Sequence, residues 1–274
     1  MDIFLVLGVI IGLSSVIVGM IVKGANVAVL LNPAAAIIIL VGTMAAVMNS
    51  FPKDEFLKIP KILGVLFKEK GKGEQASIVM EIVELSKTSR KDGLLALEKI
   101  VDSMSNKFMR KGLTMVVDGT ESSYIREVLE IEIQTVEERH RLGASIFTTA
   151  GGAAPTLGVL GAVVGLIGAL GNLNDVEKLG HMIAGAFVAT LYGIFFGYVV
   201  CHPFASRLKR KSHEEINSMY IIVEGVLAIQ EGVNPQKIQE KLIGMLEPNE
   251  RIKIEAHNIK DNLKENKNEE KRIS

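Results

Sequence analysis

The sequence predicts an all-α, polytopic membrane protein with four transmembrane helices and a helical cytoplasmic domain. The 274-residue chain is 48% hydrophobic and 23% charged, and its mean hydropathy is +0.31. These values together indicate that apolar runs alternate with strongly polar ones. Four uncharged runs are long enough to cross a bilayer as helices. The polar stretches have helical periodicity and no competing strand pattern.

Composition excludes several classes of function. The net charge is zero, so we expect no nucleic-acid partner. The single cysteine, Cys201, cannot form an intrachain disulfide, and the five histidines lack the spacing of a metal site. Phosphate-binding, dinucleotide-binding and nucleophile-elbow motifs are missing from the sequence. We therefore expect no cofactor, no metal and no enzymatic activity.

The first two runs predict a hairpin of transmembrane helices. Residues 3–22 carry no charge, and Asp2 stands where a signal peptide would be basic, so we favour a membrane helix over a cleaved leader. Asn32 and Pro33 predict the start of the second helix, with an N-cap followed by proline in the first turn. Pro52 predicts its end.

The polar region that follows predicts a helical cytoplasmic domain. Apolar stripes at helical spacing recur along it, and a helix is expected at about 106–117. A longer helix begins near Ser122. Only Gly143 interrupts its pattern, so we expect it to continue without a break into the membrane at Ala150.

Glycine dominates the third span, residues 150–171, and the fourth, residues 182–206. Glycine is costly in a water-soluble helix, but in a membrane it lets two helices approach closely. Pro155 lies inside the third span and is expected to kink it, either as a fixed bend or as a hinge. The glycines that we expect to pack against other helices are Gly158, Gly161, Gly165, Gly168, Gly185, Gly193 and Gly197.

The distribution of lysine and arginine predicts the topology. Of 31 such residues, 29 fall in the two large polar segments, and the two short connections hold only Lys23 and Lys178. The positive-inside rule then places both large segments and both termini in the cytoplasm. The predicted segments are 1–52 (helices one and two), 53–147 (cytoplasmic domain), 148–206 (helices three and four), 207–246 (cytoplasmic C-terminal helices) and 247–274 (a polar, flexible tail).

The four spans contain no Asp, Glu, Lys or Arg. Ion translocation normally requires an ionisable group within the membrane, so a partner must supply one if this chain conducts ions. A passive membrane anchor is the alternative. Thr190 stands alone in the fourth span, where a threonine usually bonds its own backbone; the other interpretation is that it lines a narrow polar path.

Three motifs resemble the MotA family of flagellar motor stator subunits, within the wider MotA/TolQ/ExbB proton channel family. They are RKDGLLALE at 90–98, APTLGVLGAVVGLI at 154–167, and AFVATLYGIFFGY at 186–198, the last followed closely by HPF. The resemblance extends to about residue 246. It implies a homo-oligomer, expected as a pentamer around a MotB dimer in the bacterial inner membrane, with MotB supplying the ion-binding aspartate.

The resemblance also assigns roles to single residues. Arg90 and Glu98 match charges that meet the rotor protein FliG. Ala162 stands where sodium-driven relatives tend to have threonine, which favours protons as the ion. The positions matching the ion pathway and its coupling are Pro155, Thr156, Ala162, Thr190 and Pro203.

Two rival functions stay open at this point. An ExbB- or TolQ-like energising subunit belongs to the same wider family, but it has three spans and an outside N-terminus, whereas this sequence predicts four spans and an inside one. A non-conducting membrane scaffold is the rival from a different class. Ion flux that depends on the partner would separate the scaffold from the stator.

Overall fold

A computed structural model describes residues 2–68 and 74–254 of the chain. Within these ranges the secondary structure is helical and contains no strand, as the sequence predicts. The chain divides into two compact units. The transmembrane unit comprises described residues up to 68 together with 139–212, and the extramembrane unit comprises 74–138 and 213–254.

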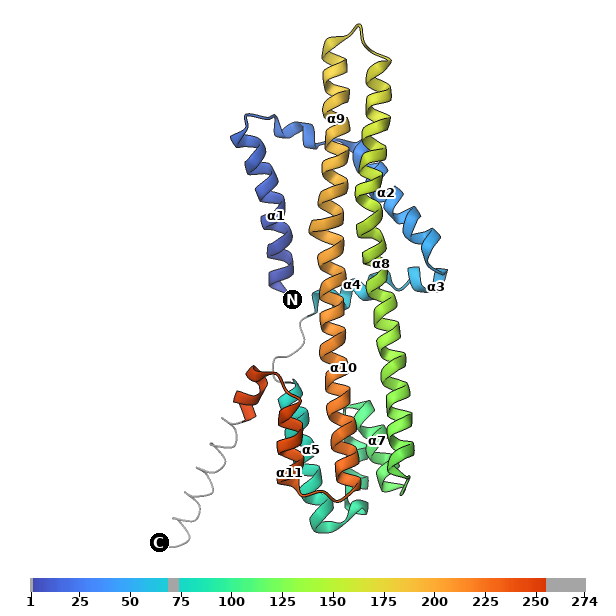
Figure 1. The fold of residues 1–274 in the computed structure, drawn as a ribbon, viewed down its shortest axis with the longest axis vertical. Helices are drawn as coiled ribbons and strands as arrows, with labels where there is room; N and C mark the ends of the chain where they lie inside the picture. The colour runs from blue at the N-terminus through green and yellow to red at the C-terminus, as the bar shows by residue number, and fades with distance from the viewer. Residues whose placement is uncertain (1, 69–73, 255–274) are drawn as a thin grey trace, which may run out of the picture. The chain divides into compact units, whose positions relative to one another are not determined.

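The described residues include the four predicted membrane spans as helices of sufficient length and apolarity. The helices that supply them are drawn in Figure 1: α1 (Ile3–Val22), α2 (Pro33–Ser50), α8 (Ser122–Leu170), and α9 (Val176–Phe195), which continues through a π-helix, η3 (Phe196–Cys201), into α10 (His202–Gln230). A 3₁₀ turn, η1 (Val27–Leu30), connects α1 to α2, and two short helices, α3 (Lys53–Phe56) and α4 (Ile59–Phe67), follow α2.

Local sequence explains where these helices begin and end. The Asn32 side chain accepts a hydrogen bond from the Ala35 N–H at 3.0 Å, and Pro33 occupies the first turn of α2, which confirms the predicted start. The helix ends at Ser50, two residues before Pro52. Helix α8 is continuous over 49 residues, so the predicted unbroken passage into the membrane span is also confirmed.

The transmembrane unit buries few side chains. Helix α1 has no buried residue. Helix α2 buries only one stripe, formed by Ala35, Ile39, Thr43 and Val47. The exposed remainder of both helices is mostly apolar, as expected for surfaces that lie against lipid or other subunits.

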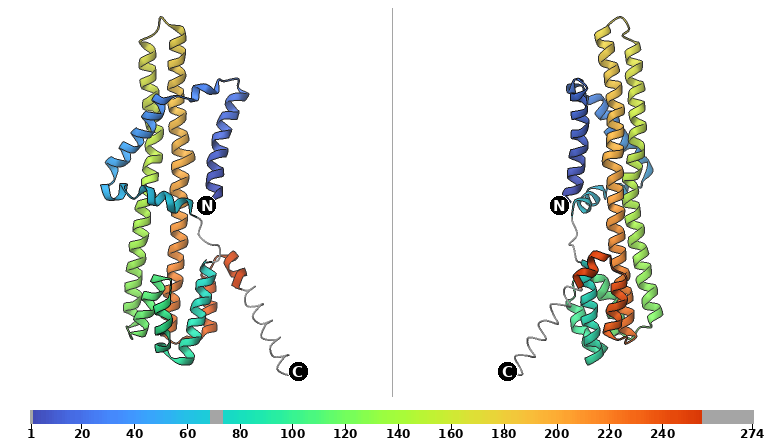
Figure 2. Two further views of the ribbon diagram at one scale, coloured as in Figure 1. Left: turned by 180° about the vertical axis from the view of Figure 1, so that it is seen from behind. Right: turned by 60° about the vertical axis from the view of Figure 1, so that its left-hand side comes forward.

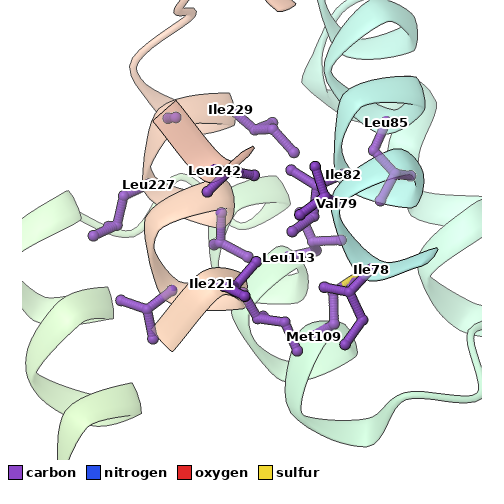
Figure 3. Close-up of a cluster of buried hydrophobic side chains, with 14 of the residues drawn as sticks. Ile78, Val79, Ile82, Leu85, Met109, Leu113, Ile221, Leu227, Ile229 and Leu242 are labelled. Carbon is purple, nitrogen blue, oxygen red and sulfur yellow. The ribbon is translucent and has the colours of Figure 1, made fainter. Parts of the chain in front are cut away.

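The extramembrane unit has a conventional hydrophobic core, shown in Figure 3. Its helices are α5 (Glu74–Asp92), α6 (Glu98–Ser103), α7 (Lys107–Val117) and α11 (Pro235–Gly244), together with the polar ends of α8 and α10. Ile82, Leu113 and Ile221 are fully buried and meet at its centre. Asn106 caps α7, accepting from the N–H groups of Phe108 and Met109.

Candidate functional site

The backbones of α8 and α9 touch along a line of glycines, which we call the glycine seam. The two helices lie side by side in all views (Figures 1 and 2). A Cβ atom added at Gly158 would lie 3.0 Å from the Ala189 carbonyl oxygen, and one at Gly193 would lie 2.5 Å from the Ala154 carbonyl oxygen. Because these obstacles are backbone atoms, neither position has room for a side chain.

The seam continues toward the end of α8. A Cβ at Gly161 would lie 2.9 Å from the Ala189 Cβ, and one at Gly165 would lie 2.9 Å from the Ala186 Cβ. A Cβ at Gly168 would lie 2.5 Å from Met182 Cε, the end of a flexible side chain. Glycine or alanine therefore faces glycine over successive turns, which is the packing that the four- and three-residue spacing predicts.

Gly185 packs elsewhere. The nearest atom to a Cβ at this position is Nδ2 of Asn32, at 2.9 Å. This glycine therefore makes room for the N-cap of α2, whereas Gly193 and Gly197 face α8. Its regular spacing, eight residues before Gly193, gave no sign of this difference.

Pro155 faces the π-helix. A Cβ at Gly197 would lie 2.9 Å from both Cδ and Cγ of Pro155 and 2.7 Å from the Gly151 carbonyl oxygen. That carbonyl is the one that Pro155, lacking an N–H, leaves without its usual donor. A proline in α8 and a π-turn in the neighbouring helix are both local defects in helical hydrogen bonding, and they meet at one level.

The two threonines differ in their hydrogen bonds. Thr190 Oγ1 donates to the Gly158 carbonyl of α8 at 3.4 Å. Among the described residues, this hydroxyl forms no hydrogen bond within its own helix. Thr156 Oγ1 donates to the Gly152 carbonyl of its own helix at 3.3 Å, and its side chain is exposed. Thr190 thus tethers α9 to α8, while Thr156 remains on an open face.

The other predicted positions are separate from the seam. Ala162 is half-buried on α8, and Pro203 is exposed near the start of α10. Arg90 and Glu98 are exposed in the extramembrane unit, at the end of α5 and the start of α6, on either side of the turn η2 (Leu94–Leu97). Neither forms an ion pair within the described ranges, and Gly93 turns the chain between them with φ +85°.

An ion pair with a buried carboxylate lies just outside the spans. Asp2 is 4% exposed, and its Oδ2 accepts from Arg207 at 2.7 Å (Nε) and 2.6 Å (Nη2). Burial alone would raise the pKa of Asp2, but the hydrogen bond and charge of Arg207 outweigh it and lower that pKa. The pair ties the start of α1 to α10.

Lys211 makes a second tie at the same end of the unit. Its Nζ donates to three carbonyl oxygens at the end of α4: Leu66 at 2.6 Å, Lys68 at 2.7 Å and Val65 at 3.0 Å. A lysine in this position satisfies the last carbonyls of a helix and complements its dipole. The ties from Arg207 and Lys211 therefore hold α1 and α4 to the beginning of α10.

Sequence reasoning missed both ties and the π-helix. Asp2 did stand out, because it replaces the basic residue of a signal peptide, but its partner is 205 residues away. The unit also contains a hydrogen bond from the Tyr192 hydroxyl to the Leu30 carbonyl, which joins α9 to η1. Among the described residues there is no cluster of side chains that could hold a metal ion.

Comparison with known proteins places these features in a family. The model of the MotA/TolQ/ExbB proton channel family matches residues 100–221. Motility protein A of Bacillus subtilis (strain 168) is 44% identical over 254 residues, which cover 93% of this chain and 94% of that protein.

Two solved structures have the same fold. The flagellar MotAB stator complex from Bacillus subtilis aligns with a TM-score of 0.85 at 44% identity, covering 90% of this chain and 97% of that one. C. jejuni MotAB aligns with a TM-score of 0.86 at 31% identity, over the same shares of the two chains. With the four apolar helices, these matches make the chain a multi-pass membrane protein.

Proposed function

Because the chain belongs to the MotA/TolQ/ExbB proton channel family, we propose that it is the stator subunit of a bacterial flagellar motor and acts in complex with a MotB-type partner. The observation that carries the proposal is the fit to MotAB complexes over nine-tenths of the chain. An all-helical membrane unit without an ionisable carboxylate in its spans agrees with a partner that supplies one.

In this proposal, protons cross at the interface between this chain and its partner. Each protonation neutralises the partner's aspartate and weakens its hold on one subunit. The ring of these chains, a pentamer around a MotB dimer, then steps around the partner. One charge moving through 100 mV releases about 2.3 kcal/mol, so a single proton supports only a small step.

Helices α8 and α9 carry the motion in this mechanism. The exposed hydroxyl of Thr156 and the half-buried Thr190 line the partner side, and Ala162 favours protons because it offers no oxygen to a dehydrating Na⁺. Pro155 and η3 allow α8 and α9 to bend together, because each breaks the regular helical ladder at the same level. Pro203 marks the end of the moving segment.

The proposed orientation places both termini and the extramembrane unit in the cytoplasm. Arg90 and Glu98 then face the rotor protein FliG. Both side chains are exposed and have no ion partner among the described residues, which supports this role because both charges are available to another protein. Helix α1, without a buried residue, faces outward into lipid.

Intracellular pH tests the ion pathway. Cells would express the chain with its MotB partner, whose periplasmic plug has been deleted, in sodium-free and in sodium-rich medium. We expect acidification without sodium, and its loss when the partner's aspartate is changed to asparagine. If both proteins are in the membrane and neither medium gives acidification, sodium-dependent swimming distinguishes a sodium motor from a non-conducting scaffold.

The rotor contact needs a separate test with a matched control. Arg90→Ala with Glu98→Ala should abolish or strongly slow swimming while leaving complex assembly intact. The control removes the exposed ion pair Lys87–Glu84, whose Nζ and Oε1 lie 2.6 Å apart on the same helix as Arg90. Unimpaired swimming in the Arg90/Glu98 variant, or equal impairment in the control, would count against these two residues as the rotor contact.

A further inference from the structure

Helix α4 runs along the edge of the transmembrane unit. Ile59 and Ile62 pack in the same cluster as Val47, near the end of α2. At the other end of α4, the Phe67 carbonyl accepts from the Asp2 N–H at 3.0 Å, at the start of α1. The end of α2 and the start of α1 lie on the same side of the membrane, because a short connection joins these two consecutive spans. Helix α4 therefore crosses the ends of the spans at the membrane boundary (Figures 1 and 2).

One face of α4 belongs to the core of this unit. Leu66 is fully buried, and Ile62, Leu63 and Phe67 pack beside it. Their neighbours include Phe204, whose ring lies edge-on to that of Phe67 with 5.9 Å between centroids. This face sets the rotation of the helix, so the opposite face must point away from the unit.

That outward face combines lysine with aliphatic side chains. Helical spacing places Lys61, Val65 and Lys68 on one side, with Lys58 beside them. All three lysines are exposed, and Val65 and the nearby Leu57 are 55% and 60% exposed.

The three lysines have no acidic partner in the part of the chain that the structure describes. Lys211, by contrast, donates hydrogen bonds to the carbonyls at the end of α4. Three ammonium groups thus remain available beside two exposed aliphatic side chains, at the level of the membrane boundary.

We propose that the outward face of α4 together with its flanking residues (Leu57, Lys58, Lys61, Val65 and Lys68) binds the anionic headgroups of the phospholipid leaflet at that end of the spans. Leu57 and Val65 contact the upper part of the acyl chains, and the lysine stems lie along the boundary while their ammonium groups reach phosphate. Charge complementarity identifies the occupant, because an anionic leaflet attracts juxtamembrane lysines and also offers hydrocarbon to the aliphatic side chains.

The chain contains no tryptophan, which permits a local test. Val65→Trp would place a single reporter on α4 in the full chain, reconstituted with its MotB-type partner in phosphatidylcholine vesicles. Quenching by brominated phosphatidylglycerol would be compared with quenching by brominated phosphatidylcholine, after subtracting the emission of the complex without Val65→Trp. We expect the association constant at this site to favour phosphatidylglycerol by roughly fivefold or more, with the preference weakening in high salt.

Matched variants test whether the three lysines cause the preference for phosphatidylglycerol. Lys58→Gln, Lys61→Gln and Lys68→Gln together should bring the ratio close to one, whereas the three arginine replacements should keep it. The control changes three exposed lysines of the extramembrane unit, Lys99, Lys107 and Lys237, to glutamine and should leave the ratio unchanged. A ratio near one in the Val65→Trp protein with its lysines intact, a preference that persists after the three glutamine replacements on α4, or an equal loss in the control would overturn the proposal. No ion flux is measured, so failure here is distinct from failure of the stator function.

Discussion

The two units hold their helices together by different means, and glycine shows the difference most directly. In the transmembrane unit, a Cβ at Gly193 would meet a backbone carbonyl oxygen at 2.5 Å. In the extramembrane unit, a Cβ at Gly225 would meet the Ile82 side chain at 2.6 Å, and one at Gly112 would meet the Leu129 and Val226 side chains at 3.2 Å. Gly193, at the centre of the glycine seam, thus makes room for another backbone, whereas Gly225 and Gly112 make room for large aliphatic side chains.

The solvent explains this contrast. In water, burying aliphatic side chains is the main driving force, so a glycine that accommodates Ile82 increases the apolar surface removed from water. In hydrocarbon, lipid tails solvate leucine as well as another helix does, and association depends on close contact between backbones. The same residue type therefore serves two different kinds of packing in one chain.

The strongest test of this contrast is a seam substitution. Gly158→Val should prevent α8 and α9 from packing, because the nearest atoms of Ala189 and Thr190 belong to the backbone and cannot move away as a side chain can. The loss of stability should exceed the value of about 1–3 kcal/mol that is typical of overpacking. Gly19→Val is the control in the same unit, since a Cβ at Gly19 on α1 would meet nothing within 4 Å. The measurement is recovery of the complex by size-exclusion chromatography after graded heating. Equal recovery of the two variants would refute the seam.

Truncation of a large side chain tests the other unit. Leu113→Ala should destabilise the extramembrane unit by about 2–5 kcal/mol, since Leu113 is fully buried and its loss leaves a cavity. Limited proteolysis should then cut this unit faster than in the parent protein. Leu95→Ala, at a side chain 73% exposed, should leave the cleavage rate unchanged. Comparable acceleration in both variants would mean that the core does not depend on Leu113.

A smaller effect is expected from the ion pair that fastens α1. Arg207→Gln should lower the free energy of unfolding by about 1–2 kcal/mol. This loss lies between the losses typical of surface and of buried ion pairs, because Arg207 keeps 42% of its side chain exposed. Asp2→Asn should cost less, because it leaves no buried charge unpaired. Thermal unfolding of the two variants at neutral pH would measure the difference, and an equal or reversed order would contradict this account.

The same pair predicts a pH dependence of definite sign. Because Arg207 lowers the folded-state pKa of Asp2, the stabilisation is present above the unfolded pKa of about 3.9 and is lost as the pH falls through the folded value. The parent protein should therefore lose stability relative to Asp2→Asn on acidification below about pH 4, and the two should run parallel above it. A gap between them that stayed constant down to pH 2 would rule out titration of Asp2.

Local signals in the sequence were sufficient for the helices themselves. Asn32 and Pro33 mark the start of α2, and the missing breaker after Ser122 predicts the continuous α8, because both depend on neighbouring residues only. The seam was also predictable in outline, since the spacing of glycines places them on one face. The spacing did not predict which element each glycine packs against. Gly185, for example, packs against Asn32, the N-cap of α2.

The features that escaped prediction depend on residues far apart in the sequence. Asp2 and Arg207 come together only in the fold, and the π-helix at Phe196–Cys201 forms where α9 passes Pro155. Thr190 shows the same limit. Its hydroxyl reaches the Gly158 carbonyl of α8 because glycine lets that backbone come close, and single-helix statistics describe only bonds within one helix.

The lone cysteine gives the chain a practical property. Cys201 is the only cysteine in the sequence, and its side chain is buried, with 2% exposed. Thiol-reactive dyes should therefore leave the parent protein unlabelled. A cysteine introduced at Gly180 of α9 would be exposed just outside the span expected at 182–206, and its side chain would meet nothing within 4 Å, so it would accept a single fluorophore per subunit. Single-molecule polarisation of that fluorophore could follow the orientation of each subunit while the complex works.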